Sequence, residues 1–260
     1  MKATFQKILV EQDGKVLYLT LNNPAKLNPM NLDVMAEIDR CLDEAREDDG
    51  IRVVVVRGAG RAFCAGEDVT QGHHWFLEGK AGTFLQGWRE KMQKMRLFPK
   101  VLIFQIHGWC VGGAVEMALC ADFLIAAEDA KLMLPQVNIG ITAMLEGAII
   151  PQAVGIVRAK QIVLTGQPID GKEAARIGLV SEAVPPDALV ARVEELANEM
   201  AEKFPAVIAA QKEIIHHWMT TDLESSIEHS VLVICKLMGN PQVFGRMKAI
   251  ADRYDAARSK

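Results

Sequence analysis

The sequence has few of the features that metal, disulfide or redox proteins need. Its five cysteines are scattered without the paired spacing of a metal site, and no cluster of His, Cys and Asp replaces that spacing. An odd number of cysteines in a chain of 260 residues is typical of a reducing compartment. We therefore expect no metal site and no permanently bound cofactor, with Cys64 and Cys110 as small buried apolar side chains.

Long hydrophobic runs and an excess of positive charge are also missing. No segment approaches the uninterrupted apolar length of a membrane span, and residues 1–15 contain no apolar stretch of signal-peptide length. A net charge of −4 disfavours binding to nucleic acid or to anionic membranes. These absences indicate a cytoplasmic protein whose partners include neither nucleic acid nor membrane.

The first half of the chain alternates between strands and helices, with no low-complexity segment or short repeat. Near-continuous β-branched runs such as residues 51–58 are typical of strands covered on both faces. Asn31 is expected to cap the helix that follows it. This alternation predicts an α/β core. The expected strands are 16–22, 51–58, 101–108 and 122–127, and the expected helices are 32–47, 84–97 and one that begins near residue 112.

After about residue 145 the pattern becomes mostly helical, with a break at 180–187. Proline and aspartate signals separate four amphipathic stretches, 187–203, 206–219, 222–238 and 241–257. We expect a core over residues 1–200 and a C-terminal helical region over 201–260. That region is either a second domain or a set of helices that packs on a neighbouring copy.

Two glycine-rich loops carry the candidate chemistry. The first covers residues 58–68 and directly follows a buried strand, and its small residues would let a ligand approach the backbone closely. In the second, residues 107–116, a strand ends, Gly112 and Gly113 turn the chain, and a helix starts. Free N–H groups at such a turn can bind an anion.

Glu116 lies three residues beyond Gly113, on the same face of the expected helix. A carboxylate beside an anion site is the arrangement needed to move a proton next to a stabilised oxyanion. Taken alone, a pair of glycines can simply let a helix pack closely on a sheet, and a single glutamate can simply be solvated. The two loops together favour an active site.

Four stretches, in this order and spacing, resemble the enoyl-CoA hydratase/isomerase (crotonase) family over nearly the whole chain. The resemblance implies stacked ββα units that form a two-sheet core, C-terminal helices that assemble trimers or dimers of trimers and cover the active site, and a role in fatty acid metabolism. It also implies an acyl-CoA thioester substrate, with coenzyme A present only as part of that substrate. The stretches are NPAKLNPM (23–30), VVVVRGAGRAFCAGED (53–68), IHGWCVGGAVEMALCADFLIAAEDAKL (106–132) and LTGQPIDGKEAARIGLVSEAVPPDAL (164–189).

The resemblance also assigns residues to roles. The thioester carbonyl would accept hydrogen bonds from the backbone N–H groups of Glu67 and Gly113, and Glu116 matches the first of two catalytic glutamates of the hydratases. His73, His74 and Trp75 fall in a region that lines the acyl pocket in relatives, although they also suit a surface loop. Further contacts with the thioester are expected at Lys26, Leu27, Ala65, Gly66, Asp68, Val69 and Gly112.

The sequence departs from the family pattern where the second catalytic glutamate is expected, because that position is Gln136. An amide cannot gain or lose a proton at neutral pH and can only orient water or substrate. Glu146 or Glu67 could supply the missing carboxylate, and Glu146 also suits the start of a helix.

These observations leave several functions open. An enoyl-CoA hydratase comes first, followed by a double-bond isomerase, which needs one carboxylate, and by a decarboxylase, which forms the enolate without deprotonating carbon. A member that binds acyl-CoA or protein without catalysis is a further alternative. A serine hydrolase is disfavoured because neither glycine-rich loop contains serine.

Overall fold

The computed structural model describes residues 4–258, apart from the side chains of residues 71, 72, 76 and 255–257. The first three residues of the N-terminal segment considered above therefore lie outside the described part. Contacts within the chain divide it into two compact units, Met1–Ala201 and Glu202–Lys260. Each unit is described by itself.

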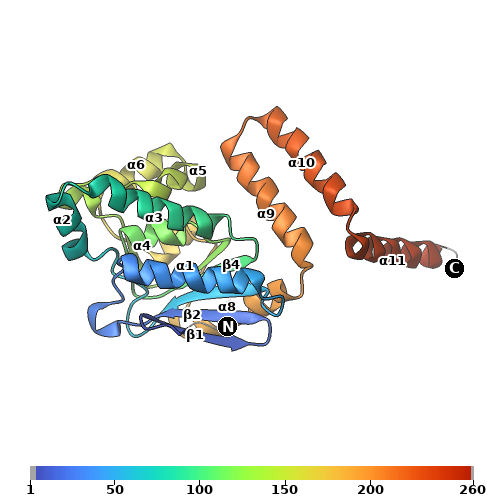
Figure 1. Ribbon diagram of the computed structural model, residues 1–260, viewed down its shortest axis with the longest axis horizontal. Coiled ribbons are helices and arrows are strands. Elements are labelled where there is room, and N and C mark those ends of the chain that lie inside the picture. The colour runs from blue at the N-terminus through green and yellow to red at the C-terminus, as the bar shows by residue number, and fades with distance from the viewer. Residues whose placement is uncertain (1–3, 259–260) are drawn as a thin grey trace. The chain divides into compact units, whose positions relative to one another are not determined.

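A six-stranded sheet forms the centre of the first unit, in the order β1-β2-β3-β4-β6-β9 (Figure 1). Strands β1 and β2 pair antiparallel, and all the other pairs are parallel. Every residue of β2 and β4 is buried, and so are the first four residues of β3, as its β-branched run predicted. The expected strands are confirmed, whereas β1 and β9 were not predicted. The bounds are β1 Ile8–Asp13, β2 Val16–Leu21, β3 Val53–Gly58, β4 Val101–Ile106, β6 Phe123–Ala127 and β9 Glu182–Val184.

A second sheet of three short strands, β5 (Trp109–Val111), β7 (Lys131–Met133) and β8 (Ile169–Asp170), makes the core two-sheeted. Residues 109–111 were expected as part of a turn, and that expectation is wrong. They form a strand because their backbone groups find partners on both sides. The strand pairs with β7, and the N–H of Cys64 donates to the carbonyl of Trp109 over 3.0 Å.

Helices cover the six-stranded sheet. Helix α1 (Leu32–Glu47) begins where the Asn31 side chain accepts from the N–H of Val34 over 3.0 Å, so the predicted cap is confirmed. It runs beside α3 (Ala81–Arg96), and Asp39 pairs with Lys94 over 3.1 Å (Figure 1). Helix α8 (Leu189–Ala201) packs on β2, β3, β4 and β6.

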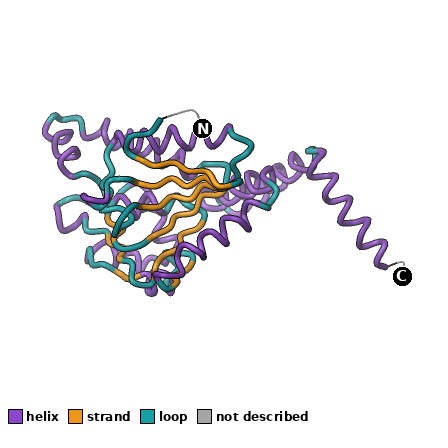
Figure 2. Tube along the Cα trace, turned by 90° about the horizontal axis from the view of Figure 1, so that it is seen from below, coloured by secondary structure: helices purple, strands orange, loops and turns teal. Residues whose placement is uncertain are grey.

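Residues 69–77 form helix α2 (Val69–Leu77), so the loop that we considered for His73, His74 and Trp75 is wrong, although His73 and His74 are exposed. The ring of Trp75 stacks on Phe84 of α3 with 5.8 Å between centroids, and this tertiary contact fixes the helix. Figure 2 shows the strands together within the surrounding helices. The remaining elements of the unit are η1 Pro24–Lys26, α4 Gly113–Ala118, η2 Gln136–Ile139, η3 Leu145–Ile149, α5 Ile150–Val154, α6 Ile156–Thr165, α7 Gly171–Arg176 and η4 Pro186–Ala188.

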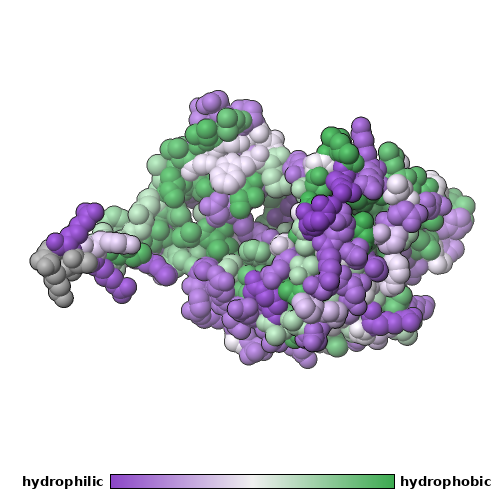
Figure 3. All heavy atoms as spheres, turned by 180° about the vertical axis from the view of Figure 1, so that it is seen from behind, coloured by the Kyte–Doolittle hydropathy of each residue, from purple (hydrophilic) through white to green (hydrophobic). Residues whose placement is uncertain are grey.

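The second unit consists of α9 (Pro205–Thr220), α10 (Leu223–Met238) and α11 (Pro241–Arg258). The first two form a hairpin in which the imidazoles of His217 and His229 stack with 3.6 Å between centroids. Large apolar side chains remain exposed on these helices, as the hydropathy colouring in Figure 3 shows, and Leu223 and Leu232 are 72% and 68% exposed. Within residues 4–258, none of the helices has the length and apolar character required to cross a bilayer.

Candidate active site

A cavity of about 630 Å³ lies where the two glycine-rich loops meet α3, η2 and η3. This volume falls in the range of small-molecule sites. The first loop contributes Ala65 to Glu67, and the second contributes Gly112 and Gly113. The structure therefore brings together two segments that are separated by more than forty positions in the sequence. Apolar walls come from Phe84, Leu85, Trp88, Met92, Ile139, Ile141, Met144 and Leu145.

Backbone pairing positions the first loop against residues 27–30. The N–H of Ala65 donates to the carbonyl of Leu27 over 2.8 Å, and the N–H of Met30 donates to the carbonyl of Gly66 over 2.8 Å. Gly66 has a φ of 94°, and a Cβ there would lie 2.5 Å from the carbonyl oxygen of Val111. Only glycine fits this close approach of the two loops.

Asn28 holds the same loop from a position that the sequence reasoning missed. Its buried amide donates to the carbonyls of Ala59 and Ala62, each over 2.9 Å, and to that of Phe63 over 3.2 Å. Its oxygen accepts from the N–H of Asn23. Asn28 also has a φ of 54°, a conformation that asparagine tolerates better than most residues. The dipeptide Asn28-Pro29 was the available signal, since it indicates a turn.

Two residues of the cavity lining have a backbone N–H group without a protein acceptor in the described chain. Glu67 and Gly113 both line the cavity, and across the described residues neither N–H group donates to another part of the chain. Gly112, with a φ of 57°, makes the turn that starts α4 at Gly113. Two free N–H groups at one cavity can stabilise a developing oxyanion.

Glu116 presents a buried carboxylate to this cavity and is only 2% exposed. Its Oε1 accepts from Gln136 Nε2 over 2.9 Å and from the N–H of Met144 over 3.3 Å. Its Oε2 has no partner among the residues described. Burial raises the pKa of Glu116 from 4.5 to about 7, although the hydrogen bond from the Met144 N–H opposes the shift. A carboxyl with this pKa can both take and release a proton near neutral pH.

Gln136 begins η2 directly after Pro135 and is buried beside Glu116. Its amide nitrogen orients the Glu116 carboxylate, and its own Oε1 has no partner in the described part of the chain. Both side chains therefore have one buried oxygen without a partner among the described residues.

The other two candidate carboxylates differ in position. Glu67 lines the cavity, and burial, followed by the nearby Asp68 charge, raises its pKa to about 7. Glu146 is buried, but its Oε1 pairs with Arg96 Nε over 3.4 Å, and its side chain is not among the described residues that line the cavity. Of these two glutamates, only Glu67 is among the described residues that line the cavity with Glu116.

The structure places the remaining candidate residues in two groups. Gly66, Ala65, Val69 and Gly112 line the cavity, as does His73. The second group is not among the described lining residues, and it consists of Asp68 at the end of the first loop, Leu27, which pairs with that loop, and Lys26 at the end of η1. Among residues 4–258, no group of three or more His, Cys, Asp or Glu side chains is arranged to hold a metal ion.

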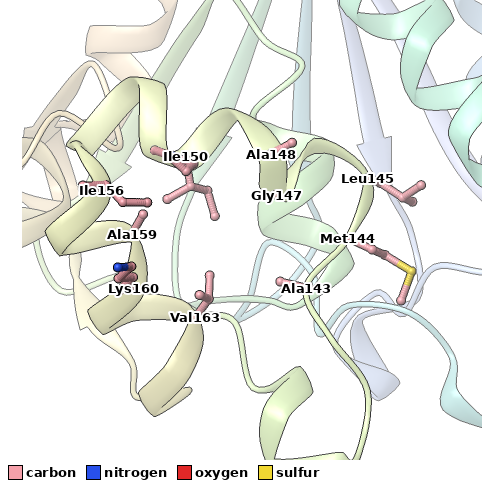
Figure 4. Close-up of a pocket in the computed structure, with 11 residues that line it drawn as sticks. Ala143, Met144, Leu145, Gly147, Ala148, Ile150, Ile156, Ala159, Lys160 and Val163 are labelled. Atoms are coloured by element: carbon pink, nitrogen blue, oxygen red, sulfur yellow. The ribbon is translucent and has the colours of Figure 1, made fainter.

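A second cavity of about 320 Å³ lies behind one wall of the first. Met144 and Leu145 line both cavities, and Figure 4 shows their side chains pointing away from Ile150 and Val163 on the far side. The segment that separates the cavities also donates its Met144 N–H to Glu116. The partition is therefore part of the support of the buried carboxylate.

Comparisons with known proteins match this architecture. The family model described as "Enoyl-CoA hydratase/isomerase" matches residues 11–241. A probable enoyl-CoA hydratase of Bacillus subtilis is 35% identical over 83% of this chain and 84% of that protein, and a short-chain-enoyl-CoA hydratase of Clostridium acetobutylicum is 31% identical over 96% and 92%. The crystal structure of an enoyl-CoA hydratase from Bacillus anthracis, 28% identical, superposes with a TM-score of 0.88 over 95% of this chain and 97% of that one. The chain thus belongs to the enoyl-CoA hydratase/isomerase (crotonase) family.

Proposed function

We propose that this protein is an enoyl-CoA hydratase that adds water to the double bond of a 2-enoyl-CoA thioester. The observation that supports this proposal best is the buried Glu116 in a cavity that is also lined by Glu67 and Gly113, whose backbone N–H groups have no protein acceptor in the described chain. The names of the relatives from Bacillus and Clostridium support the same reaction class.

In the proposed reaction the thioester carbonyl accepts hydrogen bonds from the Glu67 and Gly113 N–H groups. Glu116 Oε2 takes a proton from a water molecule that Gln136 Oε1 also holds, and the water oxygen bonds to the β-carbon. The electrons of the double bond move onto the thioester and form an enolate, which the two N–H groups stabilise. The α-carbon then takes the proton back from Glu116, so that one carboxylate serves as base and then as acid.

A double-bond isomerase is the second candidate, because Gln136 cannot titrate where the hydratases of the family have a glutamate. Isomerisation needs one carboxylate to carry a proton between two carbons, and Glu116 alone suffices. The names of the relatives from Bacillus and Clostridium favour hydration over isomerisation.

The experiment that tests this proposal is a panel of thioesters with product detection by mass spectrometry. A 2-enoyl-CoA should gain the mass of one water. A 3-enoyl-CoA converted without a change of mass would identify an isomerase, and a malonyl-type thioester that loses carbon dioxide would identify a decarboxylase. Binding without any turnover would contradict catalysis altogether.

We also propose that the second unit assembles the protein into trimers or dimers of trimers and covers the active site. Exposed apolar side chains on α10 and α11, such as Leu223, Leu232 and Phe244, support this role. A monomeric soluble protein rarely exposes so many large apolar residues close together.

A further inference from the structure

Leu145 differs from the other residues that line the main cavity in its backbone conformation. Its φ is 52°, in the left-handed region that leucine rarely adopts. Apart from glycines, only Leu27 and Asn28 share a positive φ within the described chain, and neither lines the cavity. Such a conformation persists only where the surrounding structure holds it, and residues of this kind cluster at ligand sites.

The residues on either side of Leu145 are both anchored. On one side, the N–H of Met144 donates to Glu116 Oε1 over 3.3 Å. On the other side, Glu146 Oε1 pairs with Arg96 Nε over 3.4 Å. Because Glu116 belongs to α4 and Arg96 to α3, these contacts hold the backbone at Leu145 between two helices of the first unit. They explain how an unfavourable conformation is maintained.

The side chain of Leu145 lies on the main-cavity side of this segment. Leu145 lines both the main cavity and the smaller cavity behind it. Figure 4 shows Ile150 and Val163 on the far side of the smaller cavity and the Leu145 side chain directed away from both. Leu145 is half-buried, so it keeps accessible surface beside the cavity. A branched apolar side chain therefore takes up space in the main cavity.

We propose that Leu145 sets the upper limit on the length of the acyl chain, because its side chain takes up room that a longer chain would need. This inference rests on the proposed function, which places the thioester carbonyl at Glu67 and Gly113 and the reacting carbons beside Glu116. The described lining is largely apolar and contains no lysine or arginine to balance a carboxylate, so the limited group is a hydrocarbon chain. One methylene more or less in an apolar pocket changes kcat/KM by about 10- to 200-fold, so one leucine side chain can impose a measurable limit.

The test measures kcat/KM for unbranched 2-enoyl-CoA thioesters, from crotonyl-CoA upward in steps of two carbons. In the wild-type protein kcat/KM should fall at least tenfold between two successive lengths. Leu145→Ala, which removes the side chain beyond Cβ, should move this fall to a longer thioester by at least one step. The matched control is Val163→Ala, because Val163 lines the smaller cavity and is not among the described residues that line the main one. In this control the fall should stay at the wild-type length.

A second variant separates the volume of the side chain from the strain of the backbone. Leu145→Gly differs from Leu145→Ala by one methyl group and adopts a positive φ without a steric penalty. Both variants should accept longer thioesters, but Leu145→Gly should have the higher melting temperature of the two. Because glycine suits this backbone, Leu145→Gly also keeps the test available if Leu145→Ala does not fold.

Four outcomes would overturn the inference. The wild-type kcat/KM could show no fall at any length, the limit could stay at the same length in the Leu145 variants, or Val163→Ala could move it as far. A melting temperature of Leu145→Gly no higher than that of Leu145→Ala would contradict the left-handed conformation that directs the side chain. A wild-type protein that hydrates none of the thioesters would contradict the proposed function instead, so the two failures are distinguishable.

Discussion

Glu116 acquires its properties from its surroundings, and the same holds for the other polar residues of the cavity. Burial raises its pKa to about 7, Gln136 and Met144 fix one of its oxygens, and the other oxygen remains free within the described structure. Each of these features can be tested by a single substitution.

Glu116→Gln should remove most hydration activity, because general acid/base catalysis typically contributes about a hundred- to ten-thousand-fold. The wild-type rate should rise with pH through about 7 as the buried carboxyl ionises. The variant should lose this acidic limb, which a pH–rate profile measures. Glu47→Gln, at an exposed glutamate, is the control. An acidic limb that persists unchanged in Glu116→Gln would move the role to Glu67.

The same raised pKa predicts how stability depends on pH. The folded protein holds the Glu116 proton up to about pH 7, whereas the unfolded chain releases it near 4.5, so this group destabilises the fold as pH rises from 4.5 to 7. The full cost is on the order of 3 kcal/mol and is absent below 4.5. Glu116→Gln should therefore raise the melting temperature more at pH 8 than at pH 5. An equal effect at both values would contradict the raised pKa.

Gln136→Glu tests whether the amide limits hydration. The two side chains are nearly the same size, so packing should change little and a large effect would be chemical. We expect at least about a tenfold rise in hydration of a short 2-enoyl-CoA, measured from pH 6 to 9 because burial will raise the new pKa. If the wild-type protein already hydrates its substrate rapidly and Gln136→Glu is no faster, the result would instead support the proposed mechanism in which Glu116 is the only catalytic carboxylate.

Gly113→Pro removes one of the two proposed oxyanion donors. Gly113 is the first residue of α4, a position where proline is tolerated, so the helix should persist. Loss of one such donor lowers turnover by roughly a hundred- to a thousand-fold. Circular dichroism checks the fold, and a folded variant with normal kcat would exclude this oxyanion site.

At the scale of elements, the site depends on contacts among three segments: residues 27–30, the first glycine-rich loop (58–68) and the second glycine-rich loop (107–116). The pairing of residues 27–30 with the first glycine-rich loop, and of Cys64 with β5, places both proposed oxyanion donors at one cavity. The local patterns in the sequence predicted both glycine-rich loops and the strands β3 and β4 that precede them. They did not predict β5 or α2, because both are stabilised by partners distant in sequence.

Asn28→Asp should destabilise the protein by about 1–3 kcal/mol, because the carboxylate would face three carbonyls that now accept from the amide. The free energy of unfolding in urea measures this loss. Asn22→Asp, at an exposed asparagine, introduces the same charge and should cost far less. Equal losses in the two variants would show that charge alone, and not the amide contacts, accounts for the effect.

At the scale of the whole molecule, assembly through the second unit predicts a mass of three or six times 28.6 kDa in analytical ultracentrifugation. Leu232→Glu would bury a charge in such an interface and should shift the protein toward smaller species. Val190→Glu, at an exposed apolar residue of α8 in the first unit, is the control. A monomeric wild-type protein, or an unchanged mass in Leu232→Glu, would contradict the proposed interface.

The sequence by itself determined the α/β core, the cap at Asn31 and the two glycine-rich loops, because hydrophobic period, capping side chains and glycine conformations are local properties. The resemblance to the family added two expectations to these local signals. It implied an acyl-CoA substrate, and it showed that Gln136 stands where a second catalytic glutamate is expected. Only the tertiary structure decided that Gln136 donates to Glu116, and that Glu67 lines the cavity while Glu146 pairs with Arg96. These relations join residues 20 to 50 positions apart, and no local pattern encodes which side chains meet once the strands and helices pack.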